Sequence, residues 1–226
     1  MFLVVIKIFI GYDKNEVIAY HVCVNSLIRH SSELLSITPL AENNLPYYKE
    51  THTDGSNSFI YRRFLVPELM NYKGWALYID GDMIVREDIV NLWNLRDNSK
   101  AVVCVHHNYK TKKKKKYLGN KNENYPRKNW SSVILWNCAH SANKILTSNY
   151  ISRNSGSTLH RFKWLKDELI GELPINWNWL PDEFGENYNA SLVHYTLGLP
   201  CFKDHANTPM ASEWHKERLF TEYFKK

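Results

Sequence analysis

Two carboxylates, Asp80 and Asp82, are separated by a single glycine at the end of the apolar run from Trp75 to Ile79. In an extended chain every second side chain points to the same face, so the two carboxylates point together and Gly81 adds no bulk between them. Two carboxylates at one place repel each other unless a cation lies between them, and hard oxygen ligands suit magnesium, manganese or calcium. A polar turn after a buried strand, for which Asp-Gly is a common sequence, is the alternative. The residues alone leave both interpretations open.

A second candidate site is the turn Gly11-Tyr12-Asp13, which directly follows the apolar N-terminal run. In α/β sheets, ligands bind beyond the carboxyl ends of the strands, and both this turn and the two carboxylates are expected there. Tyr12 could stack on a nucleotide base, and Asp13 could accept a hydrogen bond from a base or ribose. Asp13 and Glu16 also have the spacing of an N-terminal capping box, so a structural role for Asp13 is equally compatible with the sequence.

The elements that position these residues alternate between strands and helices. Apolar, β-branched or aromatic runs predict strands at 3–10, 34–40, 75–79, 101–107, 133–136 and 191–196. A further strand with one aromatic and one amide face is predicted where Trp177 and Trp179 alternate with Asn176 and Asn178. The alternation predicts a single mixed α/β domain with a mostly parallel central sheet flanked by helices.

Three helices are predicted from apolar residues at helical spacing. The first follows Asp13 and ends near His30, and the second runs from 58 to 72 with a bend or restart at Pro67. The third is expected to begin at Thr208 and Pro209 and to carry an apolar stripe of Met210, Trp214, Phe220 and Phe224.

The basicity of the chain is confined to one segment. Of 226 residues, 29 are Lys or Arg and 23 are Asp or Glu, and the stretch from Lys110 to Lys116 alone holds six lysines, so the rest of the chain balances. The polar residues 108–129 predict a mobile surface loop between residues 1–107 and residues 130–226. Lys112 to Lys116 could attract an anionic membrane, a diphosphate-linked lipid or a nucleic acid, although a solvated loop is the commoner outcome of such a run.

The cysteines and the N-terminus predict a cytoplasmic protein. The four cysteines are far apart and lie mostly among apolar residues, which favours buried, reduced thiols. The apolar run from Met1 to Ile10 contains Lys7 and is too short to span a membrane, so it predicts a first buried strand instead of a signal peptide. Peripheral membrane contact through the lysines stays open.

The order of several motifs resembles the nucleotide-sugar glycosyltransferases of the GT-A (Rossmann-like) fold, closest to the family 8-like group. The segments that carry this resemblance are 8–13, 61–64, 77–85 with 88–93, 131–137, 173–179 and 194–198. The similarity is spread over most of the chain. The resemblance implies a single glycosyltransferase domain, 1–226, with a nucleotide-sugar-binding part, 1–107, and an acceptor-side part, 130–226. Such a domain moves a hexose from a nucleoside-diphosphate sugar, a UDP-sugar above all, to a saccharide or lipid-linked acceptor with retention at the anomeric carbon.

The same resemblance implies roles for particular residues. Asp80 and Asp82 would bind Mn²⁺ or Mg²⁺ against the two phosphates of the donor, and His194 would complete the metal site. Such a metal neutralises the leaving group without moving a proton. Arg63 would reach the donor sugar or its diphosphate, because a guanidinium suits phosphate and hydroxyl groups. Lys203 would stand for the family's phosphate-binding lysine, but the sequence between Gly198 and Lys203 departs from the family pattern.

The catalytic group is not identified by the sequence. Ser131 and Ser132 stand where the wider family has Asn-Ala-Gly, so the usual sugar-contacting asparagine is not evident. The carboxylates late in the chain, with Asp167 and Asp182 as the leading candidates beside Glu168 and Glu183, are each expected to be solvated more often than catalytic.

Two other functions compete with transfer of a sugar. A phosphohydrolase of the haloacid dehalogenase type also places Asp-x-Asp after a strand, with the first aspartate as the nucleophile. That motif belongs on the first strand, whereas Asp80 and Asp82 follow a later one, and the later paired aspartates are missing. A nucleic-acid-binding protein acting through the lysine run is disfavoured, because no aromatic residues alternate with the lysines and the rest of the chain is neutral.

Overall fold

A computed structural model describes residues 5–53, 57 and 59–222, so the predictions for residues 3 and 4, for Ser58 and for Phe224 fall outside the described chain. The strands and helices follow in the order β1 (Val5–Gly11), α1 (Val17–Arg29), β2 (Leu34–Leu40), α2 (Val66–Leu69), β3 (Trp75–Ile79), β4 (Met83–Val85), α3 (Ile89–Trp93), β5 (Val102–Val105), β6 (Val133–Asn137), α4 (Ser148–Arg153), α5 (Gly156–Leu159), β7 (Ile170–Leu173), α6 (Pro181–Phe184), β8 (Leu192–His194) and α7 (Ala211–Glu222).

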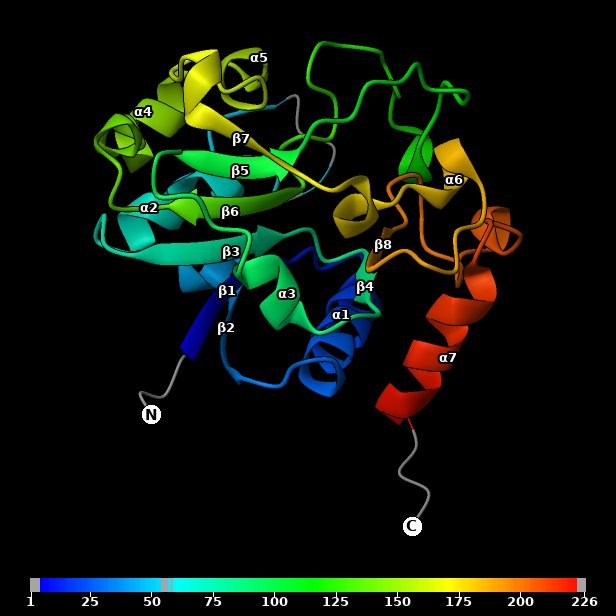
Figure 1. The fold of residues 1–226 in the computed structure, drawn as a ribbon. Coiled ribbons are helices and arrows are strands. Elements are labelled where there is room, and N and C mark those ends of the chain that lie inside the picture. The colour runs from blue at the N-terminus through cyan, green and yellow to red at the C-terminus, as the bar shows by residue number, and fades with distance from the viewer. Residues whose placement is uncertain (1–4, 54–56, 58, 223–226) are drawn as a thin grey trace.

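Within the described residues, six strands form one sheet in the order β2-β1-β3-β6-β5-β7 (Figure 1). β6 is antiparallel to its neighbours β3 and β5, and the other pairs are parallel. The predicted mixed, mostly parallel sheet is therefore confirmed. The register pairs Ile10 with Ile79, so Gly11 and Asp80, the next residues, leave the sheet side by side. The start of β6 pairs with the same edge, since Val133 lies opposite Ile79.

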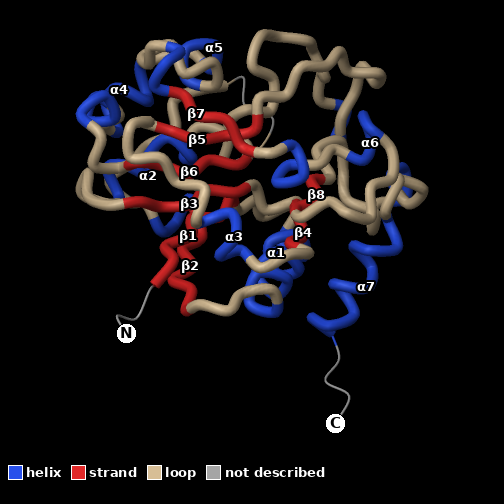
Figure 2. The backbone as a smooth tube through the Cα atoms, in the orientation of Figure 1, coloured by secondary structure: helices blue, strands red, loops and turns tan. Residues whose placement is uncertain are grey.

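Helices cover both faces of this sheet because alternate strand residues point in opposite directions (Figure 2). On one face Ile8 and Leu77 pack with residues of α1 and α3. On the other face Tyr78 and Trp136 pack with Phe64 and the region of α4 and α5. Full burial of each such side chain stabilises the fold by roughly 1.5–3 kcal/mol. The sheet edge is thereby held rigidly between two hydrophobic layers.

A small second sheet extends beyond the carboxyl ends of the main strands. β4 and β8 are antiparallel, and their register pairs Met83 with His194. A third hydrophobic cluster, which includes Tyr195, Met210 and Trp214, packs this small sheet against α1 and α7. This pairing places His194, a residue from late in the chain, opposite Met83, which directly follows Asp82.

The turn after β1 does not form the predicted capping box. α1 begins at Val17, its N-cap residue is Glu16, and no side chain caps it. Asp13 instead accepts a hydrogen bond of 2.8 Å from the backbone nitrogen of Asn15, so its carboxylate shapes the turn. The predicted end of this helix is confirmed, since His30 is its C-cap residue.

The helix predicted at 58–72 is mostly absent. A 3-10 helix, Arg62–Leu65, leads directly into the single turn of α2. The restart at Pro67 is confirmed, because proline is favoured in the first turn of a helix, where its missing N–H needs no partner. Arg62 and Arg63 are both buried in this arrangement.

The strand predicted around Trp177 and Trp179 is also wrong. Residues Ile175–Asn178 form a 3-10 helix after Pro174, and Trp177 donates its backbone N–H to the Pro174 carbonyl. A proline followed by a tight turn interrupts the extended alternation that the sequence suggested. The turn leaves Trp177 in the core and directs Asn178 toward His194.

The final helix begins at Ala211, after the predicted Thr208 and Pro209. Trp214 is buried as expected, whereas Phe220 is exposed and lies under the guanidinium of Arg29, whose carbon is 3.5 Å from the ring centroid. The predicted apolar stripe is therefore only partly correct. The strands expected at 101–107 and 191–196 are shortened to β5 and β8.

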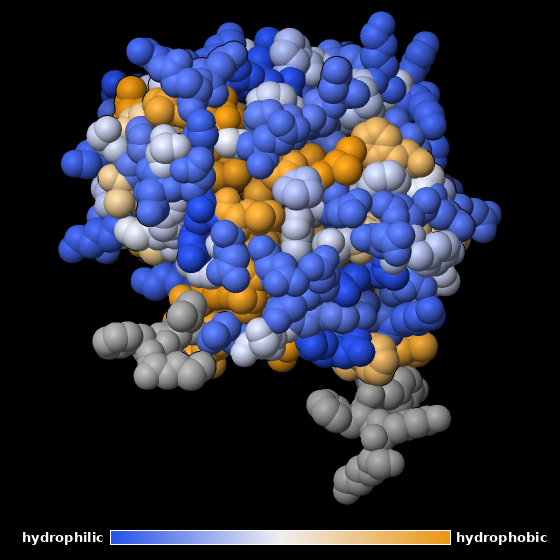
Figure 3. Space-filling model, viewed as in Figure 1, coloured by the Kyte–Doolittle hydropathy of each residue, from blue (hydrophilic) through white to orange (hydrophobic). Residues whose placement is uncertain are grey.

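The lysine-rich segment 108–129 is not a free surface loop. It runs across the upper part of the molecule in Figure 1, where the surface is hydrophilic (Figure 3). Backbone hydrogen bonds join Tyr117 to the Leu197 carbonyl at 2.7 Å and Asn122 to the Lys114 carbonyl at 2.9 Å. The first bond fastens the segment to the turn after β8, and the second joins two parts of the segment itself, so the predicted surface loop is attached to the rest of the protein.

The cysteines and the helices bear on the membrane and redox predictions. All four cysteines are free thiols, and Cys23, Cys104 and Cys138 are buried, as predicted. Within the part of the chain that the structure describes, every helix is too short or too polar to cross a bilayer.

Candidate active site

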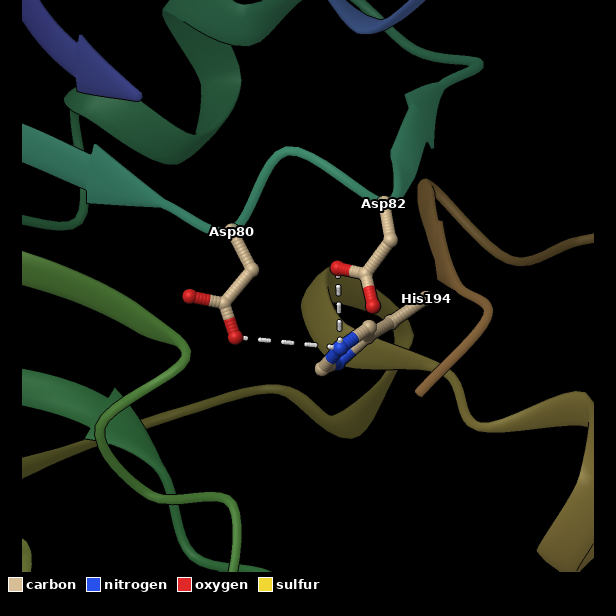
Figure 4. Close-up of side chains that lie close together, drawn as sticks. All are labelled: Asp80, Asp82 and His194. Atoms are coloured by element: carbon tan, nitrogen blue, oxygen red, sulfur yellow. Dashed lines mark ion pairs between the residues drawn. The ribbon is translucent and has the colours of Figure 1, made fainter. Parts of the chain in front are cut away.

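The centre of the site is a group of three side chains, Asp80, Asp82 and His194, that point toward one another (Figure 4). Asp80 follows β3, Asp82 precedes β4, and His194 ends β8. His194 Nε2 lies 3.3 Å from Asp82 Oδ1 and 3.8 Å from Asp80 Oδ2, and one ligand atom from each residue lies within 4.8 Å of the others. The structure thus brings together the three residues predicted as metal ligands.

The two glycines of the predicted motifs pack against each other. A Cβ atom on Gly81 would collide with the Gly11 carbonyl oxygen, and a Cβ on Gly11 would collide with the ring of Phe59. Only glycine allows two backbones to approach this closely. The close packing fixes the distance between the turn after β1 and the two carboxylates.

The Asp80 carboxylate is held in place by two donors. Tyr78 donates its hydroxyl to Oδ1 at 2.5 Å, and Arg63 Nη1 lies 3.0 Å from the same oxygen. Arg63 is itself fixed by hydrogen bonds to the carbonyls of Ser131, at 2.7 Å, and Ile60, at 2.9 Å. Burial raises the pKa of Asp80, and the Arg63 guanidinium opposes that rise. The neighbouring Arg62 instead pairs with Glu42, so Arg63 is the arginine of the site.

Asn178 determines which nitrogen of His194 faces the carboxylates. Its amide nitrogen donates to Ser132 Oγ at 2.8 Å, so its oxygen, 3.0 Å from His194 Nδ1, must accept the imidazole N–H. The neutral ring then carries its lone pair on Nε2, the nitrogen that faces Asp82. Orientation of a ligating histidine by an outer hydrogen bond is the usual arrangement in metal sites. This role is not predictable from the sequence, because the alternation of Trp and Asn around Asn178 predicts a strand.

The donor set fits a divalent cation. Asp82 Oδ1 is buried and accepts no hydrogen bond within the described chain. In the metal-free protein, burial acts to raise the pKa of Asp82, but the charge that His194 carries when protonated, together with a smaller contribution from Lys116, lowers the net pKa and favours the ionised carboxylate. Two carboxylates and one neutral imidazole suit a cation such as Mn²⁺ or Mg²⁺.

A pocket of about 270 Å³ opens in front of these ligands. Asp13 and Glu16 line the side formed by the turn after β1, and Ser131, Ser132 and His160 line the opposite side. Burial and then the carboxylates of Asp82, Asp13 and Asp80 raise the pKa of Glu16 to about 8. This crowding of negative charge is the electrostatic condition that a bound cation relieves.

Lys116 brings a positive charge into the same pocket. Its Nζ is 3.3 Å from Thr196 Oγ1, and its side chain is half-buried, whereas Lys112 to Lys115 are exposed. Burial lowers the pKa of Lys116, and the Asp82 and Asp80 carboxylates oppose that shift. The sequence could not single it out, because nothing in a run of lysines distinguishes the one that faces inward.

The other predicted site residues lie outside this pocket. Lys203 is exposed on a short 3-10 helix, and Tyr12 packs edge-on against Tyr20 with ring centroids 5.4 Å apart. Asp167 is 88% exposed and pairs with Arg127. The remaining carboxylate candidates are also engaged or solvated: Asp182 pairs with Lys113, Glu183 accepts hydrogen bonds from Thr111 and Lys112, and Glu168 is exposed.

The chain matches known proteins in sequence and in fold. The model of glycosyl transferase family 8 matches residues 24–198. Protein CDI of Arabidopsis thaliana is 39% identical over 220 residues, which cover 93% of this chain and 85% of that protein. Among solved structures, the galactosyltransferase LgtC in complex with donor and acceptor sugar analogs has a TM-score of 0.57 at 11% identity, with 98% of both chains covered.

A longer structural neighbour contains this fold as a part. The bifunctional glycosyltransferase WbbM matches with a TM-score of 0.60 at 15% identity, over 96% of this chain but 52% of that chain. The chain therefore spans about half the length of WbbM. These structural matches show the GT-A architecture, and the sequence matches show the family.

Proposed function

Because this chain belongs to glycosyl transferase family 8, we propose that it transfers a hexose from a UDP-sugar to a saccharide or lipid-linked acceptor with retention at the anomeric carbon. The observation that carries this proposal is the convergence of Asp80, Asp82 and His194 at the wall of a polar pocket. Neither rival has comparable support. The motif follows the third strand instead of the first, and the lysine run is partly anchored over the pocket.

The residues of the pocket divide the work of holding the donor. Asp80, Asp82 and His194 would hold Mn²⁺ or Mg²⁺, which neutralises charge on the departing diphosphate. Lys116, which lines the same pocket, would add a second positive charge to the phosphates. Arg63 fixes Asp80 by its ion pair of 3.0 Å and so acts on the donor through that carboxylate.

The free cysteines and the exposed lysines of the segment 112–115 suggest where the protein works. The free cysteines agree with a reducing, cytoplasmic compartment. The exposed lysines Lys112 to Lys115 lie on the segment that covers the pocket, so contact with an anionic membrane would bring a lipid-linked acceptor close to the donor. A cytoplasmic location and peripheral contact with a membrane are therefore parts of the proposed function.

The proposal is tested by a donor screen with Mn²⁺, in which release of UDP or GDP from nucleotide sugars is measured. Asp82→Asn should abolish release, because it removes a charged ligand from the metal site. Asp167→Asn is the matched control: it makes the same change on an 88% exposed side chain and should leave release unchanged.

Two results would overturn the proposal. One is that no nucleotide sugar is bound or hydrolysed by the wild-type protein, or that Asp82→Asn behaves like Asp167→Asn. The other is release of inorganic phosphate from a phosphomonoester under the same conditions, which would favour phosphohydrolase chemistry at Asp80 and Asp82.

A further inference from the structure

A second cavity, of about 320 Å³, adjoins the donor pocket. Ile60, Lys116, Tyr125 and His160 line both spaces, so the two cavities are direct neighbours. The second cavity lies beyond these shared residues from Asp80 and Asp82, on the side of α5. A cavity next to the donor pocket is a candidate place for the molecule that receives the sugar.

The lining of this cavity is strongly basic. Lys116, Lys121, Lys128 and Arg161 contribute four positive charges, and Glu123 contributes the only carboxylate among its lining residues. In the described chain, no carboxylate lies at ion-pair distance from Lys121, Lys128 or Arg161. By contrast, Arg63 pairs with Asp80, and Arg86 pairs with Glu213. The four cations of the lining therefore outnumber its one carboxylate.

Lys128 and one nitrogen of Arg161 are buried, and no carboxylate of the described chain lies at ion-pair distance from either side chain. Lys128 is 4% exposed, and its amino group donates to Asn122 Oδ1 and to the Glu123 carbonyl, each at 2.7 Å. Arg161 Nε is buried and has no hydrogen-bond partner in the described chain. Burial and then the charge of Lys116 lower the pKa of Lys128 to about 8. Buried charges are costly unless paired, so this arrangement is suited to an anionic ligand.

An aromatic ring completes the cavity. Tyr125 lies near both cations, with Lys128 Nζ 4.9 Å and the Arg161 guanidinium carbon 6.0 Å from its ring centroid. The ring is 37% exposed and borders both cavities. Aromatic faces pack against the apolar faces of sugar rings. Cations beside such a ring can therefore hold a saccharide that carries a negative group.

We propose that the second cavity binds the acceptor through a phosphate group, held by Lys121, Lys128 and Arg161, with an acceptor hydroxyl directed into the donor pocket. This proposal rests on the glycosyltransferase function above and specifies its acceptor as a sugar or polyol phosphate, free or as a lipid head group. The acceptor oxygen forms a bond to the anomeric carbon as the bond from that carbon to the diphosphate oxygen breaks. The electron pair and the hydroxyl proton leave with the nucleoside diphosphate.

The test measures binding at the second cavity while UDP and Mn²⁺ saturate the donor pocket. Calorimetry compares glucose 6-phosphate with glucose, and flotation compares vesicles that contain phosphatidylinositol with vesicles of phosphatidylcholine alone. We expect the phosphate-bearing member of at least one pair to bind at least tenfold more tightly, and binding should weaken as salt is raised. The sugar pair and the vesicle pair distinguish a soluble acceptor from a lipid head group.

Variants assign the binding to this cavity. Lys121→Gln and Arg161→Gln should each weaken it by about tenfold, as expected when a charge-assisted hydrogen bond is lost. Lys114→Gln is the matched control, because Lys114 is exposed and lines neither cavity. Lys121 is also exposed, so its replacement should not affect folding.

The proposal is wrong if neither phosphate-bearing probe is preferred, or if Lys121→Gln and Arg161→Gln bind as the wild type and Lys114→Gln do. Binding of UDP with Mn²⁺ is read in the same experiments. Loss of the acceptor preference with UDP binding intact overturns the acceptor assignment alone, whereas failure to bind UDP overturns the glycosyltransferase function.

Discussion

Asn178 provides the sharpest test of how the metal site is organised. Asn178 and His194 are 0% and 1% exposed, and the amide oxygen accepts the Nδ1 proton at 3.0 Å. Asn178→Ala removes that acceptor and leaves a buried N–H without a partner. Loss of an outer hydrogen bond to a metal-ligating histidine typically lowers metal affinity by about 10- to 100-fold, equivalent to about 1.4–2.7 kcal/mol.

A paired variant separates orientation from packing. Asn178→Asp keeps an acceptor opposite His194 Nδ1 and makes it charged, so Mn²⁺ affinity should be retained or increased. Both variants lose the donor to Ser132 Oγ, at 2.8 Å, so both should be destabilised, by about 1–3 kcal/mol. The stability of the fold should therefore fall in both variants, whereas Mn²⁺ affinity should fall only in Asn178→Ala.

The assay is calorimetric titration of Mn²⁺ into each protein, with urea unfolding in EDTA to report stability of the metal-free fold. Asn189→Ala, an exposed asparagine, is the control and should match the wild type in both measurements. Equal loss of Mn²⁺ affinity in Asn178→Ala and Asn178→Asp would refute the orientation argument. Wild-type affinity in Asn178→Ala would refute it as well.

Three further changes test other parts of the site. Lys116→Met should raise the Kd for UDP with Mn²⁺ by about 10- to 100-fold, whereas Lys114→Met should not change it; equal Kd values would contradict the role of Lys116. Gly81→Ala should destabilise the fold by about 1–3 kcal/mol in urea unfolding, because its Cβ would displace the Gly11 carbonyl, and an unchanged midpoint would disprove that contact. Between pH of about 4.5 and about 8, the metal-free folded protein keeps a proton on Glu16 that the unfolded chain has lost. The free energy of unfolding should therefore fall as pH rises through this range, by up to about 1.4 kcal/mol per pH unit. Glu16→Gln should flatten that fall in EDTA, and an unaltered pH dependence would show that Glu16 is not its source.

Elements with a strong local pattern were predictable from the sequence. The strands at 34–40 and 75–79 match their predictions, because apolar and β-branched runs bounded by turns have few alternatives. The short 3-10 helices around Arg63 and Trp177 were not predictable. In both places the local pattern suited a regular helix or strand, and packing against the sheet imposed a tighter turn.

The residues of the site divide in the same way. Asp80 and Asp82 were identifiable because two carboxylates separated by one glycine after a strand indicate a cation site. His194 was identifiable because of its place in a family pattern. Lys116 and Asn178 were not, since each is one of several identical residues in its segment. Their roles depend on which side chain turns toward the pocket, and a local pattern does not contain that information.

By itself, the sequence determined the sheet-forming runs, the pair of carboxylates and the glycine between them, because these depend on residue type and on spacing along the chain. Tertiary structure decided how His194 meets the carboxylates, through its pairing with Met83, and which lysine enters the pocket. It also gathered Lys121, Lys128 and Arg161 around one cavity. Contacts between distant segments are set by packing of the whole chain, so they become visible only when the chain is folded.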